Sequence, residues 1–300
     1  MQELIDIADL DCIYLTYDEP KKEEFWIQIQ NMVPWAKRVD GVKGSDAAHK
    51  ACADASDTDR FVLIDGDNIP DASFFNLQLD ITDTNRDCVF RWRARNIING
   101  LMYGNGGMSC WTKDFIYNMR THEATDGTAE NDVEFCFYPN YWAMHDCYST
   151  TYPNATPQQA FRAGFREGVK MCLDRGTKPT LQEFERRVHS RNYDNLCIWH
   201  SVGYDVENGN WAMHGSRLGT YLTMLTDWDY RLVQDFDELE KIWLKYSADE
   251  YYTEEFMFEI DHALRTKLCL PITSLMKEES QFFKHHYKSQ FKNLGPMVRE

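Results

Sequence analysis

The spacing of hydrophobic and polar residues predicts alternating strands and helices in the first half of the chain. Arg60–Ile64 is almost continuously apolar, which is typical of a strand buried on both faces. Cys12–Tyr17 carries a second strand pattern. Helical spacing predicts a helix over residues 22–32, and Ser45 is the expected N-cap of a helix that runs to Ala55. Further strands are predicted at residues 88–93 and 133–138.

The second half of the chain has the pattern of a helical region. Thr156, Pro157 and Gln159 form the start of a helix with a capping box, and Gly176 ends it. A capping box of Thr180 and Glu183 predicts another helix, and two more are expected over residues 237–247 and 252–268.

This order of elements predicts an α/β core over residues 1–155, with a mainly helical region over 156–300 packed on it. In open α/β sheets, ligands bind beyond the carboxyl ends of the strands. Thr16–Glu19 and Asp65–Asn68 fall at such ends.

Composition favours a folded protein outside membranes. Of 300 residues, 43% are hydrophobic and 14% aromatic. There is no apolar run of the ~20 residues that a membrane helix needs, and the N-terminus lacks the pattern of a secretory signal. The nine cysteines include no Cys-x-x-Cys pair, so we expect reduced thiols and a cytoplasmic location.

The formal net charge of −16 does not favour polyanions through the field of the whole molecule. Local basic clusters still allow contact with DNA, and arginines beside an aromatic residue suit phosphate contact and base stacking. The clusters are Arg91–Arg95; Arg162, Arg166 and Lys170; Arg186, Arg187, His189 and Arg191; and Lys284–Lys288 with Lys292. Each cluster by itself is more typical of a solvated or salt-bridged surface.

An Asp-x-Asp pair can place two carboxylates on one Mg²⁺ or Mn²⁺ ion, with substrate phosphates as further ligands. The pattern occurs five times: Asp9/Asp11, Asp57/Asp59, Asp65/Asp67, Asp227/Asp229 and Asp235/Asp237. Only the pair Asp65/Asp67 directly follows a buried-strand pattern and is separated by glycine. Asp65 and Asp67 are therefore the predicted metal ligands, and an ordinary strand-ending turn is the alternative.

Several of these features together resemble the GT-A glycosyltransferases, which transfer sugars from nucleotide-sugars. The resemblance rests on Thr16–Pro20, on the region of Arg38 and Asp46, and on Phe61–Asp67, in that order. It covers roughly the first 150 residues. It implies a Rossmann-like nucleotide-diphospho-sugar transferase fold, here with a helical C-terminal extension.

The resemblance also implies roles for individual residues. Thr16, Tyr17 and Asp18 are expected to contact the nucleoside, with Arg38 and Asp46 in the same donor-binding region. The expected cofactor is Mn²⁺ or Mg²⁺, and the expected donor is a UDP-sugar.

A narrower resemblance is to glycosyltransferases of T4-like tailed phages. It rests on Asn96–Gly107, Ala160–Glu167, Asp205–Gly209 and Gly215–Gly219. Some such phages attach glucose or arabinose to hydroxymethylcytosine in their DNA. The resemblance therefore suggests a hydroxymethylated pyrimidine in DNA as the acceptor.

Two further roles follow from the GT-A resemblance. Many GT-A enzymes supply a late histidine as a metal ligand, and His214 and His145 are the candidates. An inverting transferase also needs a carboxylate base, for which Asp132 and Glu134 are the candidates, whereas a retaining enzyme does not. Structural histidines and a solvated acidic loop are the alternatives.

We therefore expect a metal-dependent glycosyltransferase. Protein or polysaccharide is the alternative acceptor. A non-catalytic phage assembly or binding protein is the alternative of a different class.

Overall fold

A computed structural model describes residues 3–103, 108–119, 121 and 140–287. The chain divides into two compact units. Unit 1 holds the described residues up to 121 together with 140–152, and unit 2 holds residues 153–287.

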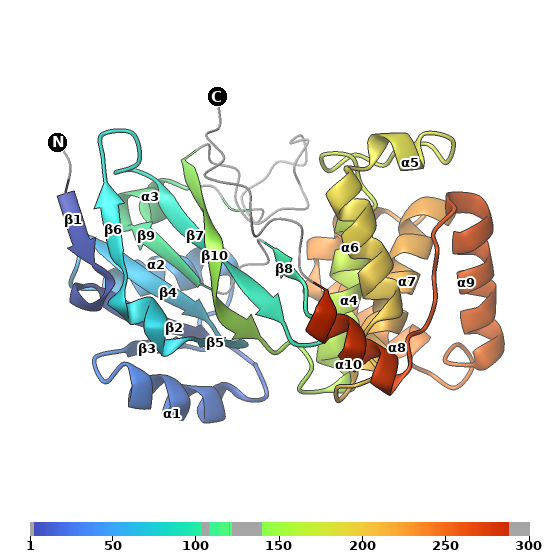
Figure 1. Ribbon diagram of the computed structural model, residues 1–300, viewed down its shortest axis with the longest axis horizontal. Helices are drawn as coiled ribbons and strands as arrows, with labels where there is room; N and C mark the ends of the chain where they lie inside the picture. Colours follow the sequence, from blue (N-terminus) through green and yellow to red (C-terminus); the bar gives the residue numbers. More distant parts are fainter. Residues whose placement is uncertain (1–2, 104–107, 120, 122–139, 288–300) are drawn as a thin grey trace. The chain divides into compact units, whose positions relative to one another are not determined.

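Unit 1 is built on an eight-stranded mixed sheet (Figure 1). Along the sheet the order is β3 (Lys37–Asp40), β2 (Asp11–Thr16), β4 (Arg60–Asp65), β9 (Met108–Thr112), β7 (Val89–Asn96), β10 (Tyr141–Thr151) and β5 (Asn68–Pro70), and β8 (Met102–Tyr103) pairs with β7. The first three strands are parallel, β9 runs antiparallel to both its neighbours, and β10 is parallel to β7. A separate antiparallel pair is formed by β1 (Glu3–Asp6) and β6 (Gln78–Ile81).

Short helices complete unit 1: α1 (Lys22–Met32), α2 (Ser45–Ala55) and α3 (Lys113–Asn118), with the 3-10 turns η1 (Ile7–Asp9) and η2 (Ala72–Asn76). Phe25 of α1 and Phe74 of η2 belong to one core cluster with Val62 and Trp92 of the sheet. The alternate strand residues, such as Leu63, are buried as well. Strand β4 is therefore buried on both faces, as its apolar run predicts.

The α/β class is shown, and the mixed sheet is compatible with a Rossmann-like fold. The predictions for β2, α1, β4 and β7 are confirmed to within a few residues. The prediction of Ser45 as an N-cap is wrong, because the cap position is Gly44, at φ 93°, and Ser45 is the first helical residue. Strand β10 was not predicted, and the strand expected at 133–138 lies outside the described residues.

Unit 2 is helical. Its helices are α4 (Pro157–Met171), α5 (Phe184–Arg187), α6 (Ser190–Ser201), α7 (Gly209–Leu225), α8 (Phe236–Tyr246), α9 (Glu254–Leu268) and α10 (Lys277–His286), with a 3-10 turn η4 (Tyr230–Gln234). Helices α8 and α9 confirm the sequence predictions, and α4 begins as predicted, with Thr156 accepting from the Gln159 N–H at 3.1 Å. The predicted end at Gly176 is wrong, because α4 ends at Met171 and Gly176 lies in a turn closed by hydrogen bonds between Asp174 and Thr177. The Gln159 side chain accepts from the Ala155 N–H instead of completing the predicted capping box. The helix predicted after Thr180 is short, since α5 has only four residues.

Helix α7 is buried on nearly all sides and packs closely on α4. Glycines make this approach possible. A Cβ atom added to Gly164 would lie 1.9 Å from the Ala212 carbonyl oxygen, and one added to Gly219 would lie 2.3 Å from that of Phe165. These glycines therefore have a packing role. Within the described part of the chain, no helix is long and apolar enough to cross a membrane.

Candidate functional site

The candidate site lies at the carboxyl ends of β2 and β4, which are adjacent parallel strands. Leu15 of β2 is paired with Asp65, the last residue of β4. Thr16 therefore ends its strand beside the Asp65–Asp67 turn. The fold places the predicted nucleoside-contact segment and the predicted metal ligands together at the carboxyl ends of the strands, where α/β proteins bind ligands.

Glu19 is a residue of this site that the sequence analysis missed. Its carboxylate accepts a hydrogen bond from the Tyr17 N–H at 2.8 Å and lies against Gly66. A Cβ atom added to Gly66 would be 2.6 Å from Glu19 Cδ. The glycine between the two aspartates therefore leaves room for a third carboxylate. In the sequence, only the place of Glu19 just after β2 pointed to it.

This concentration of carboxylates changes the chemistry of Asp65. Burial, together with the negative charges of Asp67 and Glu19, raises the pKa of Asp65 to about 7, although Arg91 opposes the rise. Tyr14 stabilises this turn, because its hydroxyl donates to the Gly66 carbonyl oxygen at 2.8 Å. A cation at this turn would offset the repulsion from Asp67 and Glu19, which adds to the effect of burial on the pKa of Asp65.

The predicted nucleoside contacts are partly brought together. Arg38 Nε donates to Thr16 Oγ1 at 3.1 Å, and Thr16 Oγ1 donates to Asp40 Oδ1 at 2.7 Å. Tyr17 and Asp18 are exposed. Asp46 forms an ion pair with Lys50 at 2.7 Å along α2.

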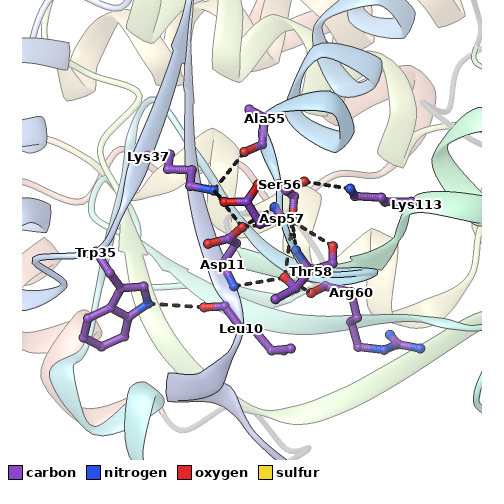
Figure 2. Close-up of polar contacts among 10 residues, drawn as sticks. All are labelled: Leu10, Asp11, Trp35, Lys37, Ala55, Ser56, Asp57, Thr58, Arg60 and Lys113. Carbon is purple, nitrogen blue, oxygen red and sulfur yellow. Dashed lines mark hydrogen bonds and ion pairs between the residues drawn. The ribbon is translucent and has the colours of Figure 1, made fainter.

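The other Asp-x-Asp pairs have different surroundings (Figure 2). Lys37 Nζ lies 2.9 Å from Asp11 Oδ2 and 2.7 Å from Asp57 Oδ2, at the amino ends of the strands. In unit 2, Asp229 pairs with Arg231 at 2.9 Å, and Asp235 caps α8. Salt bridges or helix caps therefore engage a member of each of these pairs.

No protein-family model matches the chain, and no curated protein matches it. The functional inference therefore rests on the residues of the site.

The two candidate histidines lie in different units. His145 of β10 has its Nδ1 3.3 Å from Arg93 Nη2 in unit 1. His214 belongs to α7 in unit 2, where its ring packs against Phe161 and Tyr252. Burial lowers the pKa of His214 to about 4, so the ring is neutral at pH 7. Asp132 and Glu134 lie outside the described residues.

The residues at the turn fit a hard divalent cation through two carboxylates. Among the residues that the structure describes, no group of three or more His, Cys, Asp or Glu has the geometry to hold a metal. Mg²⁺ is commonly bound by one or two protein carboxylates, with substrate phosphates and water as the other ligands. Asp65 and Asp67 match that mode, and Glu19 adds negative charge beside them.

Proposed function

We propose that this protein is a metal-dependent glycosyltransferase that moves a sugar from a nucleotide-sugar, with a UDP-sugar as the favoured donor, to an acceptor hydroxyl. One observation carries the proposal. The Asp65-Gly66-Asp67 turn ends the buried strand β4 beside the end of β2, and burial with neighbouring carboxylates raises the pKa of Asp65 to about 7. Such a turn suits a cation that is itself bound to a diphosphate.

Each residue has a defined task in this proposal. Asp65 and Asp67 would hold Mn²⁺ or Mg²⁺, which would supply positive charge beside the departing diphosphate. Thr16, Tyr17, Asp18 and Arg38 bind the nucleoside part of the donor.

In the reaction, the bond between the sugar and the diphosphate oxygen breaks, and a bond forms between the same sugar carbon and the acceptor oxygen. The diphosphate leaves with the bonding electron pair. In an inverting enzyme, a carboxylate takes the proton of the acceptor hydroxyl, and Asp132 and Glu134 remain the candidates.

The favoured acceptor is a hydroxymethylated pyrimidine in DNA. The resemblance to the phage enzymes supports it, as do Arg91, Arg93 and Arg95, which alternate along β7 of the same sheet. The alternative acceptors are protein and polysaccharide. The alternative of a different class is a non-catalytic role in phage assembly, and a test of donor binding separates it from the transferase.

Donor binding can be tested by thermal unfolding with a panel of nucleoside diphosphates and nucleotide-sugars, each with Mn²⁺ and with chelator. A ligand that binds only the folded protein raises the midpoint by mass action. We expect a shift with a uridine nucleotide that requires Mn²⁺ and is lost in Asp65→Asn.

Asp57→Asn is the matched control, because it removes the same charge at the opposite ends of the strands. A wild-type protein without a metal-dependent shift for any nucleotide would favour the assembly protein instead.

A further inference from the structure

Unit 1 contains a cavity that adjoins the Asp65–Asp67 turn. Its volume is about 510 Å³, within the range typical of small-molecule sites. Ile69 and Pro70 line it and follow closely after Asp67. Tyr152 also lines it, and the Tyr152 N–H donates to the Asp67 carbonyl oxygen at 2.7 Å. The cavity and the candidate metal site therefore share one stretch of backbone.

Three arginines lead from the aspartates to this cavity. Arg91, Arg93 and Arg95 occupy alternate positions of β7, so they project from the same face of the strand. Arg91 is close enough to Asp65 to oppose the rise in its pKa. Arg95, at the other end of the row, is exposed and lines the cavity.

The length of this row sets the size of its ligand. At about 3.3 Å per strand residue, the backbone from Arg91 to Arg95 covers roughly 13 Å. The two phosphates of a nucleoside diphosphate are directly linked, so one diphosphate at the Asp65–Asp67 turn leaves the far end of the row to another anion. A chain of phosphates matches the row better.

The wall of the cavity suits a nucleobase. Tyr148 and Tyr152 provide aromatic rings, on which bases stack. Asp146 and Thr150 provide side-chain groups that can hydrogen-bond to base edges. A neutral glycan carries no negative charge to pair with Arg95, which lines the cavity.

We propose that the cavity and the arginine row bind a nucleic-acid strand, with one nucleotide in the cavity and its flanking phosphates on Arg93 and Arg95. This inference rests on the proposed function, because the bound nucleotide presents the acceptor hydroxyl. The net charge of −16 repels a polyanion, so binding depends on this local row and weakens steeply with salt.

The test measures binding of a fluorescein-labelled single-stranded DNA by anisotropy across a salt series. The variant Arg93→Gln/Arg95→Gln is expected to bind at least about 10-fold more weakly at low salt. Its slope of log K against log salt should fall by roughly 1.4, since each single-strand phosphate contact contributes about 0.7.

The control Arg231→Gln/Lys241→Gln removes the same charge from side chains of unit 2 that are 57% and 72% exposed and belong to none of the basic clusters, and it should bind like wild type. If the double variant fails to fold, Arg95→Gln alone is expected to show half of the slope change. Arg95 is exposed, and its Nη2 lies 3.9 Å from the Met102 sulfur, which is a weak acceptor.

The proposal is overturned if wild type does not bind DNA, if the control loses as much affinity, or if the arginine variants keep DNA affinity. Loss of the uridine nucleotide shift with unchanged DNA binding would assign the row to the donor. If the wild-type protein binds DNA through the row but shows no metal-dependent nucleotide binding, the proposed function is overturned and this DNA-binding surface is not.

Discussion

The two ends of β2 and β4 carry the same Asp-x-Asp pattern in opposite electrostatic settings. At the amino ends, burial opposes ionisation of Asp11, but the hydrogen bonds from Lys37 and from the Asp57 N–H outweigh it, and the pKa of Asp11 is lowered. At the carboxyl ends, burial and like charges raise the pKa of Asp65 to about 7. The surroundings therefore decide which form of each carboxylate is favoured: hydrogen bonds stabilise the ionised form of Asp11, whereas at Asp65 burial and two neighbouring carboxylates outweigh the opposing charge of Arg91.

The largest expected effect is on catalysis. Asp65→Asn and Asp67→Asn should each reduce sugar transfer about 10³-fold or more, because the loss of several kcal/mol of metal-assisted stabilisation of the leaving diphosphate corresponds to that factor. The measurement is release of nucleoside diphosphate with Mn²⁺ and acceptor DNA. Asp57→Asn should retain wild-type turnover, and equal loss in all three variants would remove the distinction between the two ends.

The next effect is the pH dependence of stability. The folded-state pKa of Asp65 is above its unfolded value, so its contribution is present at low pH and is lost as pH rises towards about 7. In the presence of chelator, the free energy of unfolding of wild type relative to Asp65→Asn should fall by roughly 2–3 kcal/mol between pH 5 and pH 8. Urea unfolding at both pH values measures this difference. A difference that rises with pH would mean that Asp65 is stabilised as a carboxylate in the metal-free protein.

At the amino ends, Lys37→Met should destabilise the fold by about 2 kcal/mol, because it leaves the partly buried Asp11 without its cation. The wild-type contribution of Asp11 has the opposite sign to that of Asp65. It is present above the unfolded pKa and is lost as pH falls through the lowered folded pKa. Urea unfolding at pH 7 tests the first point, and metal-dependent nucleotide binding by the folded variant should be unchanged.

The smallest expected stability effect is at Gly66. In Gly66→Ala the new Cβ displaces the Glu19 carboxylate, which is the end of a flexible side chain, so the loss of stability should stay below about 1 kcal/mol. The affinity for Mn²⁺, measured by calorimetry, should nevertheless fall severalfold. The double variant Gly66→Ala/Glu19→Ala removes the clash, and no further loss of affinity relative to Glu19→Ala alone is expected if the effect acts through Glu19.

Local patterns were sufficient where a single segment carries the signal. The apolar run Arg60–Ile64 identified β4, the helical spacing of apolar residues identified α1, and Thr156 with Pro157 marked the start of α4. The position of Asp65 and Asp67 at the end of a buried strand also followed from local sequence. These features depend on side chains a few residues apart, which the chain order fixes directly.

Helix α7 shows why other features needed the tertiary structure. Glycines weaken a helix in isolation, so Gly215 and Gly219 lowered the helical signal of a segment that forms the buried helix of unit 2. The close packing of α4 against these glycines offsets that cost.

The sequence by itself determined the α/β class, the buried strand β4 and the Asp-Gly-Asp turn that ends it. The tertiary structure decided which carboxylates have a cation of the chain as partner, placed Glu19 against Gly66, and put Arg95 on the wall of a cavity that begins beside Asp67. The physical reason is that charge interactions and burial depend on distances between segments far apart in the chain. Aspartates of the same Asp-x-Asp motif therefore have pKa shifts of opposite sign only once the sheet has formed.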